Sequence, residues 1–252
     1  MKRLFSVLLA VVLAGAIFAV GCYENCSGLM PYKEEKTSGD YVYRIFDANA
    51  DYDYEHIAII GLSEEGQQKR ELLIPEEIDG IPVVCLGYVS SWTAREGSFD
   101  SDVLEKIFIV KPYDSISQIF LGKSPNLKKI IMLNSSTYEG FNQRHNDKEL
   151  LPKIEALKLN IVNNECYANV VYYLNDGGEE ICFADDCDGE KITFVPPEPQ
   201  REGYTFGGWY KEKECINEWD FEKDEVPAKA YDDEGNYLFQ ETSLYAKWNK
   251  KT

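Results

Sequence analysis

The sequence is poor in histidine, in methionine and in positive charge. It has 2 histidines and 3 methionines among 252 residues, and 26 lysines and arginines stand against 44 acidic residues. Neither His56 nor His145 lies near a nucleophile motif, which argues against a serine or cysteine hydrolase. The formal net charge of -18 repels phosphate backbones, so we expect no nucleic-acid partner.

Metal-binding motifs are also lacking. None of the 7 cysteines forms a Cys-x-x-Cys pair, which argues against a zinc knuckle. Two acidic runs resemble calcium loops only in part, and in the first Tyr52 and Ala58 stand where an EF-hand loop needs glycine and glutamate. We interpret both runs as solvated turns and expect neither metal nor cofactor. Their residues are Asp47, Asn49, Asp51 and Asp53 in the first run and Asp185, Asp186, Asp188 and Glu190 in the second.

The N-terminus has the features of an exported protein. Residues 1–21 combine Lys2 and Arg3 with a long apolar run, the pattern of a secretory signal. Small residues directly before Cys22 resemble a bacterial lipobox, which implies that Cys22 is acylated; an ordinary signal peptide that leaves Cys22 as a thiol is the alternative. Residues 22–40 are polar and aperiodic, so we expect a lipid anchor followed by a tether.

Export permits disulfide bonds in the six remaining cysteines. Cys182 and Cys187 could close a hairpin, while Cys85 and Cys215 fit buried thiols equally well. The pairing pattern therefore stays open for Cys26, Cys85, Cys166, Cys182, Cys187 and Cys215.

A short apolar motif recurs within residues 41–164. Residues 104–109 and 127–132 share the form Leu-x-Lys-Ile at an offset of 23 residues, and residues 154–159 give a weaker copy 27 residues later. Each copy predicts a short strand that buries its apolar side chains only by stacking on its neighbours. Together with residues 71–87, which predict two strands around an Asp-Gly turn, the segment resembles the BspA-type leucine-rich repeat of bacterial surface proteins.

This resemblance implies a short solenoid over residues 41–164 whose strand face binds a protein ligand. We expect four apolar positions of the copies to be buried, Leu104, Ile107, Leu127 and Ile130. We expect the intervening positions to be exposed and to contact the partner: Lys106, Phe108, Lys128 and Lys129.

The most distinctive stretch is REGYTFGGWY at residues 201–210. It predicts a strand with Phe206 and Trp209 on opposite faces and a bulge or close backbone approach at Gly207-Gly208. With three further motifs before and after it, the stretch resembles the internalin B-repeat, also called the Listeria-Bacteroides repeat. We expect the tryptophans to be core residues rather than ligand platforms. The structural motif residues are Gly177, Gly178, Gly203, Tyr204, Phe206, Gly207, Gly208, Trp209, Trp219, Phe221, Tyr245 and Trp248.

The repeat resemblance implies a β-grasp domain over residues 165–252. Strands are predicted at 170–174, 192–195 and 244–248, with one short helix-like turn. Residues 230–237 look like an inserted hairpin, which we expect to be a secondary binding contact through Asp232, Asp233 and Asn236.

The fold class that we predict is mainly β with α+β elements, a short leucine-rich-repeat solenoid followed by a β-grasp domain. The function that we predict is non-catalytic: adhesion or protein-protein recognition, with a protein ligand on a host or neighbouring bacterial surface. The membrane is contacted through the lipid anchor only. A structural spacer without its own ligand is the alternative, followed by a divergent hydrolase. Ligand identity, repeat number and oligomeric state stay open.

Overall fold

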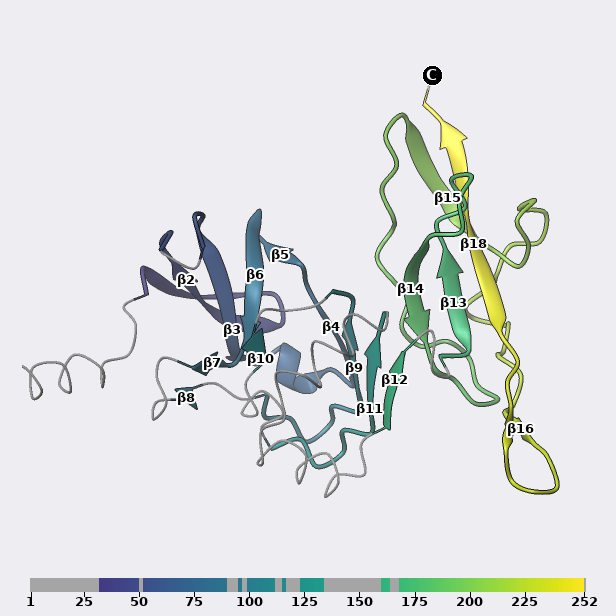
Figure 1. Ribbon diagram of the computed structural model, residues 1–252, viewed down its shortest axis with the longest axis horizontal. Coiled ribbons are helices and arrows are strands. Elements are labelled where there is room, and N and C mark those ends of the chain that lie inside the picture. The colour runs from purple at the N-terminus through teal and green to yellow at the C-terminus, as the bar shows by residue number, and fades with distance from the viewer. Residues whose placement is uncertain are drawn as a thin grey trace, which may run out of the picture.

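The computed structural model describes residues 32–49, 52–89, 95–96, 99–111, 115–116, 123–133, 160–163 and 168–251 (Figure 1). Within these ranges the chain is mainly β, with one short 3-10 helix, η1 (Gly66–Gln68), and no α-helix. None of the helices described here is both long enough and apolar enough to cross a membrane. Several sequence predictions lie outside the described residues, namely those for residues 1–21, Cys22, Cys26, Asp51, His145, residues 154–159 and Cys166.

The N-terminal part begins with sheet A. Its strands run in the order β1-β2-β3-β6-β10, and β5 pairs with β6 off this path. β1 falls where we expected the tether to continue, and that prediction is wrong because all five residues of β1 pair with β2. The strands are β1 (Glu34–Ser38), β2 (Tyr41–Phe46), β3 (His56–Leu62), β5 (Glu77–Ile78), β6 (Ile81–Leu86) and β10 (Ser115–Ile116).

The predicted Asp-Gly turn joins β5 to β6. Ile78 pairs with Ile81, so the loop consists of Asp79 and Gly80 alone. Both loop residues have positive φ, 55° and 76°, which is the geometry of a type I′ hairpin turn. The turn prediction is therefore confirmed. A separate short hairpin pairs β7 (Tyr88–Val89) with β8 (Arg95–Glu96).

Sheet B contains the repeated motif. Its four strands are all parallel and lie in the order β12-β11-β9-β4. The two described motif copies are aligned, since Lys106 pairs with Lys129 and Ile107 with Ile130. Leu104, Ile107, Leu127 and Ile130 are buried as predicted. The strands are β4 (Glu71–Ile74), β9 (Lys106–Ile109), β11 (Lys129–Met132) and β12 (Asn160–Asn163), and they do not amount to a demonstrated leucine-rich-repeat solenoid.

The C-terminal sheet has the order β14-β13-β18-β15, with β13 and β18 parallel at its centre. Instead of the strand predicted at 192–195, the segment before Pro196 and Pro197 forms no strand, and β14 takes the place beside β13. One helical turn is present, where the Asp224 N–H donates to the Asp220 carbonyl. The strands are β13 (Val170–Tyr173), β14 (Ile181–Asp185), β15 (Tyr204–Tyr210) and β18 (Thr242–Lys250), with the hairpin β16 (Ala230–Tyr231) and β17 (Tyr237–Leu238).

Strand β15 carries the predicted bulge. The register against β18 shifts between Phe206 and Trp209, and Gly208 has φ of 105°. A Cβ on Gly207 would lie 2.5 Å from the Asn249 side-chain amide, so a larger residue here would displace that exposed side chain. The extra residue moves Trp209 onto the face of Phe206, and their ring centroids are 5.2 Å apart. The prediction that these two side chains lie on opposite faces is therefore wrong.

Candidate functional site

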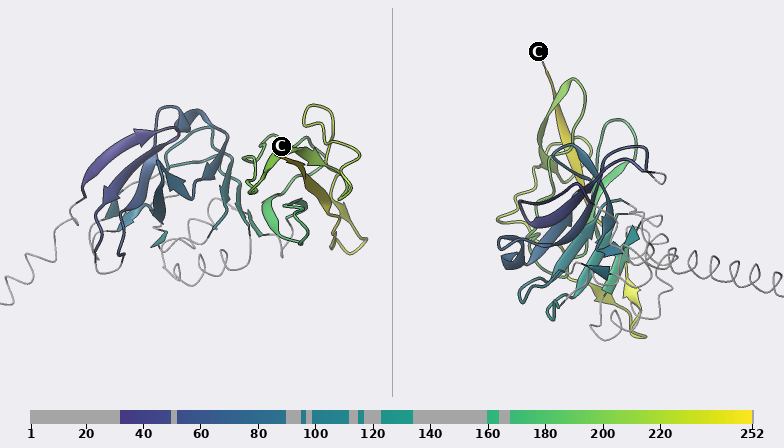
Figure 2. Two further views of the ribbon diagram at one scale, coloured as in Figure 1. Left: turned by 90° about the horizontal axis from the view of Figure 1, so that it is seen from above. Right: turned by 90° about the vertical axis from the view of Figure 1, so that its left-hand side faces the viewer.

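The candidate site lies where sheet B meets the C-terminal sheet (Figures 1 and 2). The parallel register lines up rows of side chains on the outer face of sheet B. One row is charged and the next is apolar, and each row meets a matching part of the C-terminal sheet. The charged row is Glu71, Lys106 and Lys129, and the apolar row is Leu73, Phe108 and Ile131.

The charged row binds two consecutive aspartates. Lys106 Nζ lies 2.8 Å from Asp185 Oδ1 and 3.1 Å from Glu71 Oε1. Lys129 Nζ lies 2.9 Å from Asp186 Oδ2 and donates to the Asp186 carbonyl at 2.8 Å. Both aspartate side chains are completely buried. The lysine at the third position of each motif copy therefore serves as an anchor for the C-terminal sheet.

A third lysine completes the charge balance. Lys229, just before β16, places Nζ 2.6 Å from Asp186 Oδ1. Neither Asp186 carboxylate oxygen has hydrogen-bond geometry, so these two contacts are ionic. Asn169 holds the same segment, because its amide nitrogen donates to the Cys187 carbonyl and its amide oxygen accepts the Cys187 N–H.

The pKa values in the cluster reflect its burial. Burial by itself would lower the pKa of Lys106, but the Asp185 carboxylate and the other acidic groups nearby raise it well above its ordinary value. Burial also raises the pKa of the Cys187 thiol, so Cys187 is protonated at neutral pH. Lys106 is thus a cation paired with acid at neutral pH, and Cys187 is held as a thiol.

The apolar row packs against aromatic rings of the C-terminal part. The Phe108 ring lies 5.0 Å from that of Phe183 and 4.5 Å from that of Phe194, measured between centroids. Phe108 is 1% exposed and Lys106 is 9% exposed, so the prediction that both are exposed for ligand binding is wrong. The C-terminal sheet covers them. Lys129 is partly covered, whereas Lys128 is exposed as predicted.

The second acidic run is only in part the solvated turn that we expected, since Asp188 and Glu190 are exposed but the two residues before them are not. Asp185 and Asp186 are completely buried, and lysines compensate their charges. Asp185 pairs with a lysine of sheet B, and Asp186 pairs with another lysine of sheet B and with Lys229. The first run does fit the prediction: the Asp47 side chain is solvated, and Tyr52 N–H donates to Asn49 Oδ1 to close a turn. No cluster of potential metal ligands occurs among the described residues.

The cysteines of the described ranges are thiols. Cys182 and Cys187 do not form the hairpin disulfide considered above, and Cys215 is not part of a disulfide either. The Cys182 thiol donates to the Tyr172 carbonyl at 3.4 Å, and that of Cys187 to Asp185 Oδ2 at 3.6 Å. Their side chains point to different partners, which explains why no bridge forms.

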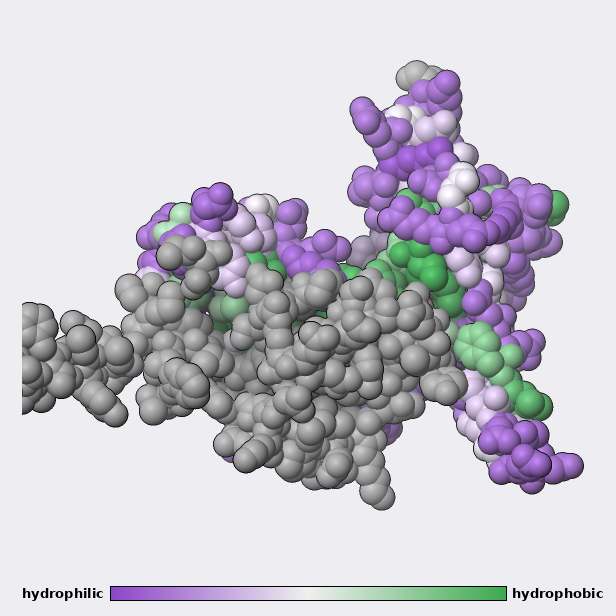
Figure 3. All heavy atoms as spheres, viewed as in Figure 1, coloured by the Kyte–Doolittle hydropathy of each residue, from purple (hydrophilic) through white to green (hydrophobic). Residues whose placement is uncertain are grey.

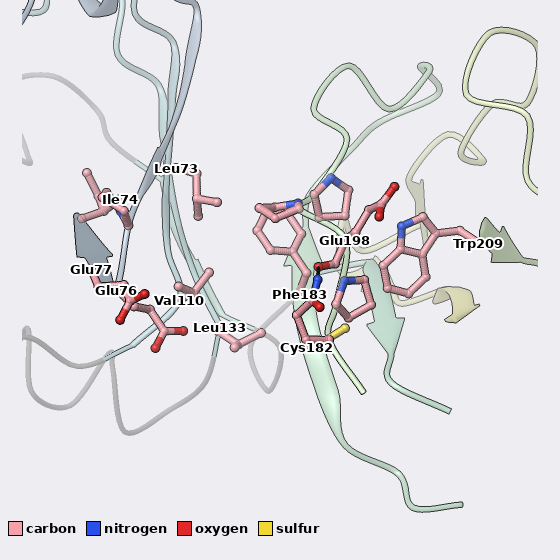
Figure 4. Close-up of a pocket in the computed structure, with 15 residues that line it drawn as sticks. Leu73, Ile74, Glu76, Glu77, Val110, Leu133, Cys182, Phe183, Glu198 and Trp209 are labelled. Atoms are coloured by element: carbon pink, nitrogen blue, oxygen red, sulfur yellow. Dashed lines mark hydrogen bonds between the residues drawn. The ribbon is translucent and has the colours of Figure 1, made fainter. Parts of the chain in front are cut away.

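Beyond the apolar row, the two parts diverge and leave a groove of about 570 Å³ (Figure 4). Leu73, Val110 and Leu133 form the wall from sheet B. The opposite wall consists of β14, a proline-rich segment and an indole ring, and Figure 3 shows hydrophobic surface in this hollow. The opposite wall contains Cys182, Phe183, Pro196, Pro197, Glu198, Pro199 and Trp209.

The inserted hairpin projects away from the body (Figure 1), as β16 and β17 pair antiparallel. Asp232 shapes its tip, because its carboxylate accepts the N–H groups of Glu234 and Asn236 and the Asn236 side-chain amide. Asp232 and Asn236 therefore stabilise the loop, while Asp233 is exposed. Sequence reasoning missed the exposed apolar side chains at the base of the hairpin, Tyr231, Leu238 and Phe239.

The aromatic motif residues of the repeat belong to its core. Trp209 and Trp219 are buried, and the half-buried Trp248 donates its indole N–H to the Leu174 carbonyl at 2.6 Å. Phe206 and Phe221 pack on the same cluster, and Tyr245 stacks on Tyr173. The remaining motif positions lie where the backbone turns: Gly177, Gly203 and Gly208 with positive φ, Gly178 beside the Asp176 carboxylate, and Tyr204 at the start of β15.

Comparison with known proteins identifies the C-terminal sheet. Residues 169–247 match the Listeria-Bacteroides repeat domain, as the motif resemblance implied. No leucine-rich-repeat or BspA family matches the chain. A relative from Evansella cellulosilytica, named as a Gly-rich membrane protein, is 31% identical over 78 residues, which are 31% of this chain and 8% of that protein. The chain thus contains a repeat domain of a type found in surface proteins.

Proposed function

We propose that this protein is an exported, lipid-anchored bacterial surface protein that binds a protein partner and catalyses no reaction. The Listeria-Bacteroides repeat domain at residues 169–247 supports a place at the cell surface. The observation that carries the binding function is the projecting hairpin, whose base exposes Tyr231, Leu238 and Phe239 to between 50% and 58%. Apolar and aromatic residues gathered on a projecting element are typical of protein-binding surfaces.

The aromatic side chains of the hairpin gather into one contact surface. The Tyr231 and Tyr237 rings lie 5.7 Å apart, and the Phe239 ring lies 5.9 Å from that of Tyr237. Lys229 Nζ lies over the Tyr237 ring and also bonds Asp186, which ties the hairpin base to the buried charge cluster. Because these side chains already contact one another in the unbound chain, the hairpin loses less conformational entropy on association.

The hairpin assignment predicts a loss of partner capture. Replacing Tyr231, Leu238 and Phe239 together by serine should abolish retention of a surface protein by the immobilised chain, while the melting temperature stays unchanged. Capture from intact-cell surface extracts, read by mass spectrometry, measures this. The matched control is Ile216→Ser, which removes an apolar side chain that is 73% exposed elsewhere on the repeat. Equal capture by the triple variant and the unaltered chain would contradict the assignment.

Anchoring through Cys22 is a separate prediction. The apolar run before the small residues and Cys22 supports acylation of this cysteine. Mass spectrometry of the membrane fraction should find a mature chain that begins with a doubly or triply acylated cysteine, since stable anchoring needs at least two chains. Cys22→Ala should release the protein or leave its signal uncleaved. An unmodified mature chain in the medium of unaltered cells is the contrary outcome.

The spacer function is the second candidate, and the packing of sheet B on the repeat favours it. Two buried lysine-aspartate contacts and an aromatic cluster join the two parts into one unit. A spacer has no partner of its own, so hairpin variants would leave all interactions unaltered.

We interpret the repeat as a β-grasp domain because its first and last strands are parallel neighbours at the centre of a mixed sheet.

A further inference from the structure

We propose that the groove between sheet B and the repeat domain binds an extended peptide in which apolar side chains alternate with lysine or arginine. This inference deepens the proposed protein-binding function, because it assigns a second contact and states the partner's chemistry. The groove is independent of the hairpin, since none of its lining residues belongs to β16 or β17.

The shape of the groove suits short apolar side chains. Its volume of about 570 Å³ lies within the range typical of ligand pockets. Leu73, Val110 and Leu133 are only partly buried, and they face Cys182 and Phe183 across the gap (Figure 4). The two walls come from different sheets held together by buried ion pairs, so the groove is formed before a ligand enters it.

The charge of the groove selects a basic occupant. Glu76 and Glu77 lie at one end, and Glu198 lies on the opposite wall beside Trp209 (Figure 4). All three carboxylates belong to exposed residues, and among the described residues none of them takes part in an ion pair or a side-chain hydrogen bond. The neighbouring cation, Lys111, directs its ammonium group to the Glu76 carbonyl at 2.8 Å. Three carboxylates around an apolar floor attract a cation that carries apolar groups.

The backbone of the proline-rich segment in the repeat wall offers acceptors but few donors. Pro196, Pro197 and Pro199 have no N–H, so between 196 and 199 only Glu198 can donate from its main chain. The proline-rich segment forms no strand, and its Glu198 carbonyl accepts from the Gln200 side chain. An incoming peptide must therefore supply the donors, which lysine, arginine and its own N–H groups do.

Electrostatics disfavour other occupants. A second copy of this chain carries the same net charge of -18, and an anionic lipid surface is repelled by the same carboxylates. A basic, partly apolar segment of another protein is complementary in both respects.

Fluorescence anisotropy with a labelled hexapeptide, Gly-Lys-Leu-Lys-Phe-Gly, tests the inference on the purified whole chain. We expect saturable binding that weakens with salt. The same peptide with glutamate for lysine, and one with serine for leucine and phenylalanine, should not bind. The double variant Glu76→Gln, Glu77→Gln should weaken binding by about tenfold or more, since a hydrogen bond to a charged group contributes about 1.5 to 3 kcal/mol.

The matched control is Glu202→Gln with Glu225→Gln, which removes two exposed carboxylates outside the groove. Unaltered affinity in this control, with loss in the groove variant, supports the inference. Absence of saturable binding, binding of the glutamate peptide, or equal losses in both variants would overturn it. If peptide binding fails while hairpin-dependent capture persists, the groove inference alone is wrong; the reverse result leaves the groove and refutes the hairpin.

Discussion

Replacing Asp185 by alanine is expected to lower the free energy of unfolding by about 3 to 5 kcal/mol, the usual effect of removing one partner of a buried ion pair. The Asp185 carboxylate is completely buried, and Lys106 Nζ lies 2.8 Å from it. Without Asp185, the ammonium group stays inside the interface with only Glu71 at 3.1 Å. Urea unfolding followed by circular dichroism measures the loss.

Two further variants separate this effect from a general one. Lys128→Ala removes an exposed pair with Glu105 and should change stability by at most about 1 kcal/mol. The double variant Lys106→Met, Asp185→Leu should recover most of the stability, because apolar residues of similar volume replace the pair. If Asp185→Ala costs no more than Lys128→Ala, the buried pair does not stabilise the interface.

The pair also has an alkaline signature. Because the pKa of Lys106 is raised in the folded chain, its contribution is fully present below the ordinary lysine value of about 10.4 and is lost as the pH rises through the folded pKa. The Asp185→Ala variant should lack most of this alkaline loss. Unfolding curves between neutral and strongly alkaline pH compare the two proteins.

Trp209→Ala should cost about 3 to 5 kcal/mol, as removal of a buried aromatic ring usually does. Trp209 is 3% exposed, and its ring makes edge contacts with Tyr172 at 4.9 Å and Phe206 at 5.2 Å between centroids. Its ring also forms part of the groove wall on the repeat-domain side. Alanine therefore leaves a cavity in the core of the repeat domain that the surrounding sheet cannot refill.

The control for Trp209 is an exposed aromatic residue of the same domain. Tyr231→Ala removes a ring that is 58% exposed and should change the unfolding free energy by no more than about 0.5 kcal/mol. Urea unfolding of both variants decides the matter. A small cost for Trp209→Ala would mean that its indole belongs to a binding surface instead of the core.

Local patterns in the sequence predict many elements of this fold. The Leu-x-Lys-Ile copies predict β9 and β11, Asp79-Gly80 predicts a tight hairpin, and Gly207-Gly208 predicts the bulge in β15. Each of these features is decided within a few residues, by backbone sterics or by side-chain alternation. The same locality explains why the repeat motif could be recognised.

The candidate site could not be predicted in this way, because its partners are far apart in the chain. Lys106 and Asp185 are separated by 79 positions. The alternation of side chains along β9 correctly placed Lys106 and Phe108 on the face of sheet B opposite to Ile107. It does not predict which part of the chain covers that face. Parallel sheets are usually covered on both faces, and sheet B follows that rule. The predicted stacking of the motif copies was the available signal, but it did not specify parallel pairing.

Asp186 also determines how the molecule carries a mechanical load. A pull on the hairpin enters the C-terminal sheet at the start of β18, and the connection from sheet B enters at the start of the adjacent parallel strand β13. Because β13 and β18 are parallel, their first residues lie at the same end of the strand pair. Force applied at these two points would separate the strands one hydrogen bond at a time. Asp186 bonds Lys229 at the hairpin base and Lys129 in β11, which creates a direct path around the sheet. Tension between the hairpin and sheet B would therefore act on the two Asp186 contacts before the repeat begins to unzip.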